Sequence, residues 1–489
     1  MTLSGPARFG LLLSMAAGAA LAQDAGAALQ RARKAMGDVK SIRYSGTGHL
    51  GSVGMNWNTT SPWHMTAVSK YIRTIDYAGG SSTEEITRNQ ENPPMLGGEA
   101  PFVDEIHEGR RVSGKYAWNQ PANANPPLPP NVARAVPDTA YERALQIQLT
   151  PHGFLKAAAE NHARAQPGDE AGKKVTVVTF TSGKNKIAGT LDGQNLLTTV
   201  KTAIPNPVLG DMVVETAYSD YKDFSGVKFP MHIVQKQGGF TTLDLAVTSV
   251  EPNVNDAALQ VPDAIVNAKP AADPVTPEKL ADGVWMLHGR ASSGLIEFRD
   301  YVAVVDAPTD EARSIAVIEA VKKLVPNKPI RYVINTHHHF DHSGGLRTYV
   351  AEGATVITHE GNKAFYEWAW KQPHTMEPDR LSEHPKDATF ATYKTKYVLT
   401  DGNRTAEVHL TIGDLHDEYL SFVYLPKEKL VIEVDDFSDR YATALSLGLW
   451  NNLLGNFQRL SIEPERIAPL HGAIITMPEW LKLLRDSTR

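Results

Sequence analysis

The chain of 489 residues contains no cysteine. This absence excludes disulfide bonds, zinc sites with thiolate ligands and catalysis by a cysteine nucleophile. Stability must therefore come from packed cores, and the length is sufficient for two or three domains that each bury one. The hydrophobic fraction of 42% and the charged fraction of 21% are ordinary for a globular protein.

The N-terminal apolar run is too short to cross a membrane. It extends from Phe9 to Ala20, about twelve residues, whereas a transmembrane helix needs about 20. Arg8 precedes the run, and Ala20-Leu21-Ala22 has the form of a signal-peptidase site. These features predict a cleaved signal peptide over residues 1–22 and a periplasmic or secreted protein without stable membrane insertion.

Positive charge is not in excess either. The formal net charge is −6, and no run of basic residues is present. Proteins that bind nucleic acid usually carry a basic patch or stripe. We therefore expect no nucleic-acid partner and a small-molecule substrate, whereas the sequence leaves the oligomeric state open.

Histidine is concentrated near the C-terminus, and its densest cluster is Thr-His-His-His-Phe-Asp-His-Ser-Gly-Gly at residues 336–345. This segment follows a strand-like apolar run at residues 330–335. His337 and His339 are two residues apart, so in extended backbone their side chains leave on the same side. Two imidazoles can hold one metal ion while Asp341 and His342 reach a second. A surface cluster with incidental metal affinity is the alternative interpretation.

The pattern His-x-His-x-Asp-His followed by Gly-Gly resembles the metal motif of the metallo-β-lactamase-fold hydrolases. The resemblance covers residues 279–489. It implies an α/β fold, specifically a four-layer αβ/βα sandwich with a dinuclear metal site at one edge. Members of this family hydrolyse β-lactams, lactones, thioesters, sulfate esters and phosphodiesters, so the motif identifies the site better than the substrate.

The resemblance also implies where the remaining ligands lie. A third histidine should precede a later strand, where His416 fits better than His409, which sits inside an alternating strand. A bridging carboxylate should follow the next strand, where strand alternation lets only one of Asp435 and Asp436 face the metals. Asp435 is preferred because the strand, this aspartate and the following Phe437-Ser438 match the family's usual arrangement. A last histidine, His471, ends a short apolar strand before a glycine.

Two zinc ions are the expected cofactors, because neutral imidazole and carboxylate suit borderline ions; iron, manganese and cobalt are alternatives. One metal takes three histidines, the other takes Asp341 and two histidines, and one aspartate bridges. His338 alternates with its neighbours and should point away from the metals, and His359 either supports the site or bonds within its loop. The predicted ligands are His337, His339, His416, Asp341, His342, Asp435 and His471.

Residues 23–260 contain segments in which apolar and polar residues alternate, separated by glycines. This pattern predicts an antiparallel, β-rich α+β domain. The pattern is similar to lipoprotein-carrier-like half-barrels, which hold apolar ligands on a concave face; a packing domain without a ligand is the alternative. Residues 261–278 are rich in Ala and Pro and predict a linker. We expect the first domain to shape substrate access without supplying metal ligands.

The expected function is that of an exported dinuclear-metal hydrolase. A metal-activated hydroxide would attack a carbonyl ester, lactone or amide, with Asp341 as ligand and catalytic residue that orients it. A β-lactamase or a sulfate-ester hydrolase of the same fold is the alternative, although the lack of cysteine excludes β-lactamases with a zinc-binding cysteine. An alternative of another class is a non-catalytic envelope carrier of apolar ligands.

Overall fold

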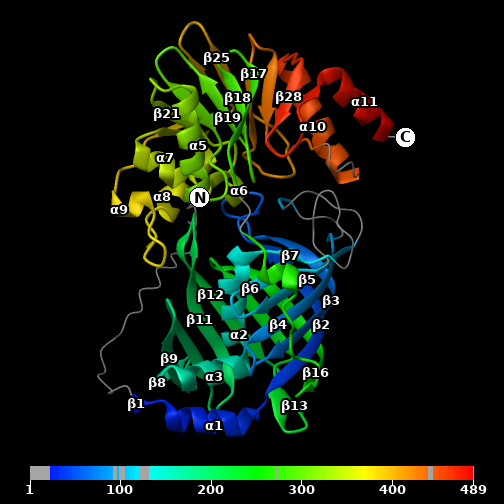
Figure 1. Ribbon diagram of the computed structural model, residues 1–489, viewed down its shortest axis with the longest axis vertical. Helices are drawn as coiled ribbons and strands as arrows, with labels where there is room; N and C mark the ends of the chain where they lie inside the picture. The colour runs from blue at the N-terminus through cyan, green and yellow to red at the C-terminus, as the bar shows by residue number, and fades with distance from the viewer. Residues whose placement is uncertain are drawn as a thin grey trace.

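The computed structural model describes residues 23–91, 96–98, 105–120, 132–269, 273–438 and 444–487. The predicted signal peptide, residues 1–22, lies outside these ranges. Within them, no helix is both long enough and apolar enough to span a bilayer. The chain forms two parts, seen one above the other in Figure 1, with the N-terminal strands below and the C-terminal sheets above.

The N-terminal part is built on one 14-stranded sheet in which all neighbouring strands are antiparallel. Its spatial order is β1-β8-β9-β10-β11-β12-β15-β16-β2-β3-β4-β5-β6-β7. The strands are β1 Gln23–Asp24, β2 Ser41–Ser52, β3 His64–Asp76, β4 Ser81–Asn89, β5 Ile106–Ser113, β6 Tyr116–Asn119, β7 Arg134–Ala135, β8 Arg164–Glu170, β9 Lys173–Ser182, β10 Asn185–Leu191, β11 Leu197–Asn206, β12 Gly210–Ser219, β15 His232–Gln237 and β16 Phe240–Pro252.

Helices cover this sheet, and α2 and α3 appear across its face in Figure 1. Helix α3 begins with Pro151 at its first turn, where the missing N–H costs nothing, and it buries Phe154 completely. The smaller elements are α1 Gly26–Met36, the 3₁₀ turn η1 Pro137–Thr139, α2 Ala140–Gln148, α3 Pro151–Glu160, the hairpin β13 Lys222–Phe224 with β14 Val227–Phe229, and α4 Asp263–Val266. The prediction of an antiparallel, β-rich N-terminal domain with helices is confirmed.

The C-terminal part contains two mixed sheets. One has the order β17-β18-β19-β20-β21-β22-β23 and is parallel from β20 onward; the other has the order β24-β25-β26-β27-β28-β29, with β27 and β28 parallel. The strands are β17 Thr276–Ala281, β18 Val284–His288, β19 Ser293–Glu297, β20 Val302–Val305, β21 Ile330–Ile334, β22 Thr355–His359, β23 Phe390–Tyr393, β24 Lys396–Thr400, β25 Thr405–Leu410, β26 Ser421–Leu425, β27 Leu430–Glu433, β28 Arg466–Pro469 and β29 Ile475–Thr476.

Three apolar clusters define four layers in this part. Side chains from both sheets, among them Val305 and Ile432, form the central cluster. A second cluster packs helices such as α5 on the seven-stranded sheet, and a third packs α10 and α11 on the six-stranded sheet. The predicted order of helices, sheet, sheet and helices is confirmed. The helices are α5 Glu311–Leu324, α6 Phe340–Ser343, α7 Leu346–Glu352, α8 Glu360–Ala369, α9 Arg380–Glu383, α10 Ala444–Leu460 and α11 Met477–Ser487.

The segment predicted as a linker is partly structured. The last strand of the large sheet ends at Pro252, and β17 already begins at Thr276, so the end of residues 261–278 belongs to the seven-stranded sheet. Proline at position 277 is compatible with β17 because that strand lies at the sheet edge, where a missing N–H is tolerated. Helix α4 occupies part of the remainder. Prolines therefore interrupt the chain here without leaving it free of regular structure.

The two parts also share apolar contacts. Phe340, in the histidine motif, is buried in the core cluster of the N-terminal part. Its ring meets Trp63 edge to face at 5.8 Å between centroids. A second contact joins Asp211 to the backbone N–H of Thr375 at 3.0 Å. The N-terminal sheet thus packs directly against the motif-bearing loop.

Candidate metal centre

The candidate ligands gather because they follow strand ends at one edge of the sandwich. His337 and His339 come after β21, His416 lies in the loop after β25, and Asp435 and His471 follow β27 and β28. Strands β25, β27 and β28 point in the same direction, since β26 is antiparallel to both β25 and β27 and β28 is parallel to β27. Their carboxyl ends therefore share one edge, which faces the loop after β21.

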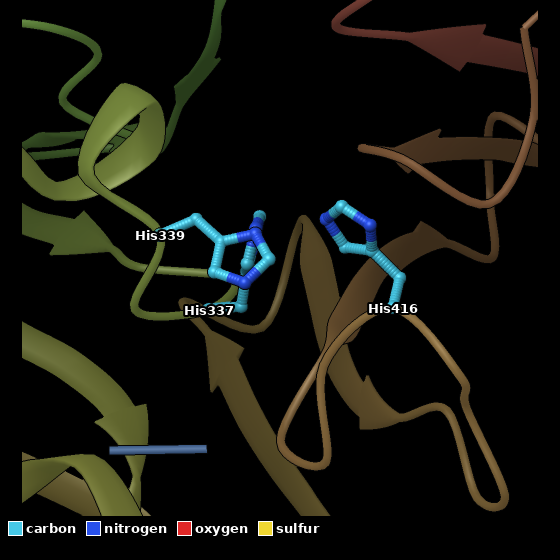
Figure 2. Close-up of side chains that lie close together, drawn as sticks. All are labelled: His337, His339 and His416. Atoms are coloured by element: carbon cyan, nitrogen blue, oxygen red, sulfur yellow. The ribbon is translucent and has the colours of Figure 1, made fainter. Parts of the chain in front are cut away.

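His337, His339 and His416 form the first group. Each offers a nitrogen within 4.8 Å of the others, and all three residues are buried. Figure 2 shows the His416 ring approaching from its own loop toward the two rings of the motif. Burial and the neighbouring histidines lower the pKa of His339 to about 3 and hold that of His337 well below its usual value. Both rings are therefore neutral near pH 7, the form in which imidazole binds metals.

Asp341, His342 and His471 form the second group. The Nε2 atoms of His342 and His471 are 2.8 Å apart, and an oxygen of Asp341 lies 3.4 Å from the first and 3.5 Å from the second. Asp341 and His471 each keep 32% of their side-chain surface exposed. Solvent therefore reaches the second group, whereas the first is enclosed.

Asp435 stands between the two groups. Its Oδ2 lies 3.4 Å from Nε2 of His337, 3.5 Å from Nε2 of His416 and 3.2 Å from Nε2 of His342. Its Oδ1 lies 3.6 Å from Nε2 of His471. This is the position that a bridging carboxylate would need.

Asp436 turns the other way. Its carboxyl group is buried beside that of Asp414, and burial together with this neighbour raises its pKa well above the usual value. Burial likewise raises the pKa of Asp414. Asp414 Oδ1 accepts the backbone N–H of His416 at 2.7 Å, so the pair supports the His416 loop from behind.

The outward nitrogens of the motif histidines are bound to oxygens. His342 Nδ1 donates to Asp306 Oδ2 at 2.9 Å, and His337 Nδ1 lies 3.2 Å from Thr336 Oγ1, which donates to the same carboxylate oxygen. Each bond suits a ring that carries its proton on Nδ1, so that the inward Nε2 can offer its lone pair to a bound cation. Such bonds fix the tautomer and orientation of metal-binding histidines.

The inward atoms fit a metal ion. His337 Nε2 and His339 Nδ1 are buried without a hydrogen-bond partner, a costly arrangement for polar atoms unless a ligand satisfies them. The facing lone pairs of His342 and His471 likewise need a shared proton or cation. Nitrogen and carboxylate donors of this kind suit zinc and neighbouring divalent metals.

Three further histidines lie outside both groups. His409 stays in β25, bonded to Glu407 and stacked on Phe422. His359 contacts the Lys394 carbonyl, between β23 and β24, at 2.8 Å through Nε2, and its Nδ1 accepts the Gly361 N–H at the start of α8. His338 points away from the predicted metals, as its alternation indicated, with Nδ1 2.5 Å from Asp417 Oδ2.

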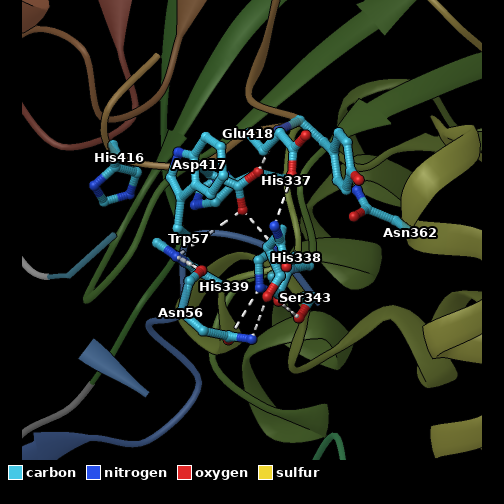
Figure 3. Close-up of polar contacts among 12 residues, drawn as sticks. Asn56, Trp57, His337, His338, His339, Ser343, Asn362, His416, Asp417 and Glu418 are labelled. Carbon is cyan, nitrogen blue, oxygen red and sulfur yellow. Dashed lines mark hydrogen bonds and ion pairs between the residues drawn. The ribbon is translucent and has the colours of Figure 1, made fainter. Parts of the chain in front are cut away.

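A loop of the N-terminal part completes the surroundings of the motif. Asn56 meets two histidines at once: its backbone oxygen lies 2.9 Å from His339 Nε2, and its side-chain oxygen lies 3.0 Å from His338 Nε2. Figure 3 shows these bonds beside Asp417 and Glu418. Nε2 of His339 donates its hydrogen to the backbone oxygen of Asn56. The lone pair of this ring is therefore on Nδ1, which faces the first group. The N-terminal part thus orients a candidate ligand through a backbone oxygen.

The same loop is tied to the His416 loop. Trp57 Nε1 donates to the Asp414 carbonyl at 3.1 Å, and Asn58 Nδ2 donates to Glu418 Oε2 at 2.7 Å. The sequence analysis did not identify this loop, because it contains no metal-binding pattern. It also missed Asp306, which a polar residue at the end of a buried apolar strand could have revealed.

Residues 288–432 match the family model described as the Metallo-beta-lactamase superfamily. A metallo-beta-lactamase from Pontibacter korlensis is 19% identical, with 43% of this chain and 99% of that one covered and a TM-score of 0.35. The metallo-beta-lactamase FIM-1 from Pseudomonas aeruginosa in its mono-zinc form is 20% identical, with 45% and 98% covered and a TM-score of 0.35.

A flavodiiron protein from Giardia intestinalis is 17% identical, with 45% of this chain and 60% of that one covered and a TM-score of 0.35. These structural scores are too low to add to the family match. No curated protein matches the chain. The family match and the two-sheet sandwich together assign the metallo-β-lactamase fold to the C-terminal part.

Proposed function

We propose that this protein, whose C-terminal part has the metallo-β-lactamase fold, is a dinuclear-metal hydrolase of a carbonyl ester, lactone or amide. One observation carries the proposal: inward nitrogens and carboxylate oxygens converge in two groups around Asp435. Buried donors without partners favour metal binding over a merely structural histidine cluster. In this proposal residues 23–260 and 279–489 are two domains.

The residues would divide the work as follows. His337, His339 and His416 would hold one ion, and Asp341, His342 and His471 the other, with Asp435 shared. Two zinc ions at such a site would lower the pKa of a shared water and polarise the scissile carbonyl. Asp341, whose side chain is partly exposed, would orient the attacking water.

The second group favours a reaction at the rim of the site, because Asp341 and His471 are partly exposed whereas the first group is buried. We infer that the leaving group departs on this open side. A sulfate ester or β-lactam would present similar oxygens to the same atoms, and these substrates are the alternative.

A substrate panel tests the proposal. The purified full-length chain, loaded with zinc, is assayed on a lactone, a carboxylic ester, an amide, a β-lactam, a sulfate ester and a phosphodiester. We expect turnover of the carbonyl substrates, its loss on chelation and its return with zinc. Turnover of sulfate esters alone would favour the alternative. No turnover by protein that holds two zinc equivalents would contradict the hydrolase.

We also propose that the protein acts outside the cytoplasm, on the basis of the sequence at residues 1–22. Fractionation of cells that express the full chain, with N-terminal sequencing of the product, tests this. Mature protein that begins at Gln23 in the periplasm or medium is expected, and uncleaved protein in the cytoplasm would contradict it.

A further inference from the structure

Three apolar side chains keep part of their surface exposed beside the first group of candidate ligands. Trp57 lies in the loop after β2, Leu96 lies in the segment of residues 96–98, and Leu415 lies in the loop after β25. Leu96 is 42% exposed, Leu415 is 40% exposed and Trp57 is partly exposed. Single exposed apolar residues are ordinary, whereas a group of them at one place marks a contact surface. We call these three residues the apolar patch.

Backbone contacts hold the three segments of the apolar patch side by side. The N–H of Gly97, which follows Leu96, donates to the Leu415 carbonyl at 2.9 Å. Gly97 also forms an antiparallel bridge with Asn56, the residue before Trp57. The patch is therefore assembled from both parts of the molecule.

The apolar patch adjoins the candidate metal centre. Leu415 directly precedes His416 in the chain. Trp57 directly follows Asn56, whose backbone oxygen lies 2.9 Å from His339 Nε2. Figure 3 shows Trp57 beside Asn56 and the loop that carries His416. A molecule bound at the metals would thus have apolar side chains next to the first group.

Core packing does not account for the position of Trp57. Within the described residues, none of the apolar core clusters includes Trp57, Leu96 or Leu415. The indole N–H of Trp57 donates to the Asp414 carbonyl at 3.1 Å, which holds the ring against the His416 loop. A tryptophan with its polar tip bound and part of its apolar body exposed is suited to contact a ligand.

We propose that the apolar patch binds the apolar chain of the substrate, so that the preferred ester, lactone or amide carries an extended apolar acyl group. The inference rests on the proposed hydrolase function and names its substrate class. Ligand sites combine apolar contact with a few polar groups, and here the metal-binding residues supply the polar groups. The acyl chain then lies on the side of the first group, while the leaving group departs on the open side.

Calorimetric titration of the zinc-loaded, full-length protein tests the inference, with acetate and decanoate as probes that differ only in chain length. Burial of one methylene favours binding by roughly fourfold. Because the patch is partly open, we expect the whole decanoate chain to raise affinity by roughly tenfold or more. Equal affinity for the two probes, or no binding of decanoate, would overturn the inference.

Turnover separates this inference from the hydrolase proposal. We expect kcat/KM to be higher for 4-nitrophenyl decanoate than for 4-nitrophenyl acetate. Protein that binds decanoate with the expected preference but hydrolyses neither ester would contradict the hydrolase and support the patch as a binding surface. Hydrolysis of both esters at equal kcat/KM would support the hydrolase and overturn the patch.

Variants locate the contact. Trp57→Ala should lower the ratio of decanoate to acetate affinity by roughly fivefold or more, since it removes the largest side chain of the patch. Trp57→Phe keeps an apolar ring but loses the bond to Asp414, so it should retain most of the ratio. If Trp57 served only to tie the loops together, both variants would behave alike, and that result would overturn the inference. Trp368→Ala, at a 49% exposed tryptophan on α8, is the matched control and should leave the ratio unchanged.

Leu415→Asn is an independent variant of the same patch. It replaces an apolar side chain by a polar one of similar size and should also lower the ratio of decanoate to acetate affinity. This variant decides if Trp57→Ala does not fold. An unchanged ratio in folded Leu415→Asn and Trp57→Ala would overturn the assignment.

Discussion

The two parts of this protein place their charged groups in opposite ways. The C-terminal sandwich keeps its interior apolar, with Val305 and Ile432 fully buried between the sheets, and collects histidines and aspartates at the strand ends. The N-terminal sheet instead turns charged side chains such as Arg73 and Glu108 into its own concave interior. A closed sandwich leaves only its edge for chemistry, whereas a curved sheet has an inner face that can hold polar groups around a cavity.

The comparison also shows how the two parts depend on each other. Asn56 from the N-terminal part meets the motif histidines, and Phe340 from the motif is buried in the N-terminal core. Residues of the N-terminal part therefore complete the surroundings of the histidine motif at the edge of the C-terminal sandwich.

Replacing His339 should abolish the centre. His339→Ala removes a donor of the first group, so zinc content should fall by at least one equivalent and kcat/KM by roughly a thousandfold or more, since the ions supply several kcal/mol of stabilisation. Elemental analysis and the substrate panel measure both. His384→Ala, at an exposed histidine of the same part, is the control. Near-normal turnover by His339→Ala would refute the site.

The adjacent aspartates should behave differently under the same isosteric change. Asp435→Asn removes the charge shared by both groups, so the content of both metals and the activity should fall. Asp436→Asn should retain metal, because this carboxyl is buried beside Asp414 and not among the ligand atoms of either group, and burial already raises its pKa well above the usual value. Metal content and activity of the two variants, compared side by side, measure this. The reverse result would move the bridge to Asp436.

Removing the Asn56 side chain should weaken the centre from the other part of the molecule. Asn56→Ala deletes the side-chain oxygen that meets His338 but keeps the backbone oxygen that meets the candidate ligand His339, so we expect metal affinity to fall by less than the roughly 10–100-fold typical of a lost bond to a ligand. Competition with a chromophoric chelator measures zinc affinity. Asn403→Ala, in an exposed turn of the C-terminal part, is the control. If the two variants bind zinc equally, the N-terminal part does not support the centre through this side chain.

The packing between the parts can be tested at Gly54. Its φ is +80°, and an added Cβ would lie 2.3 Å from the ring of Phe340. Gly80 has a similar φ of +65° with no neighbour within 4 Å, so it reports the backbone strain alone. Gly54→Ala should therefore lower the free energy of unfolding by about 1–3 kcal/mol more than Gly80→Ala, the usual cost of overpacking. Urea denaturation of both variants measures the difference. Equal losses of unfolding free energy would mean that the Phe340 ring moves aside without cost.

Much of the candidate site was predictable because its determinants are local. The spacing of His337, His339, Asp341 and His342 along a strand end indicates a shared direction whatever surrounds it. The distant members His416, Asp435 and His471 needed the family resemblance as well. The structure brings all of these together, and it separates Asp435 from Asp436 by direction, which alternation alone left open.

Other features could not be predicted, because they depend on contacts between distant segments. Asn56 is 282 residues from His338, and nothing in its neighbourhood resembles a metal motif. The expected linker failed in part for a related reason, since β17 is fixed by its pairing with β18 rather than by its own composition. The alternation of charged residues in β4 and β5 can be seen in the sequence. Alternation alone, however, does not show which of the two faces of the sheet is the concave one.

The strand and turn pattern, the absence of thiol chemistry and the four-residue core of a metal motif follow from side-chain type and short-range spacing, so they were predictable. Contacts between distant segments select which nitrogen of His339 faces inward, which aspartate stands between the groups and which face of the N-terminal sheet carries charged side chains. Those choices are set by hydrogen bonds, burial and charge balance across segments hundreds of residues apart, and such free energies exist only once the chain has folded.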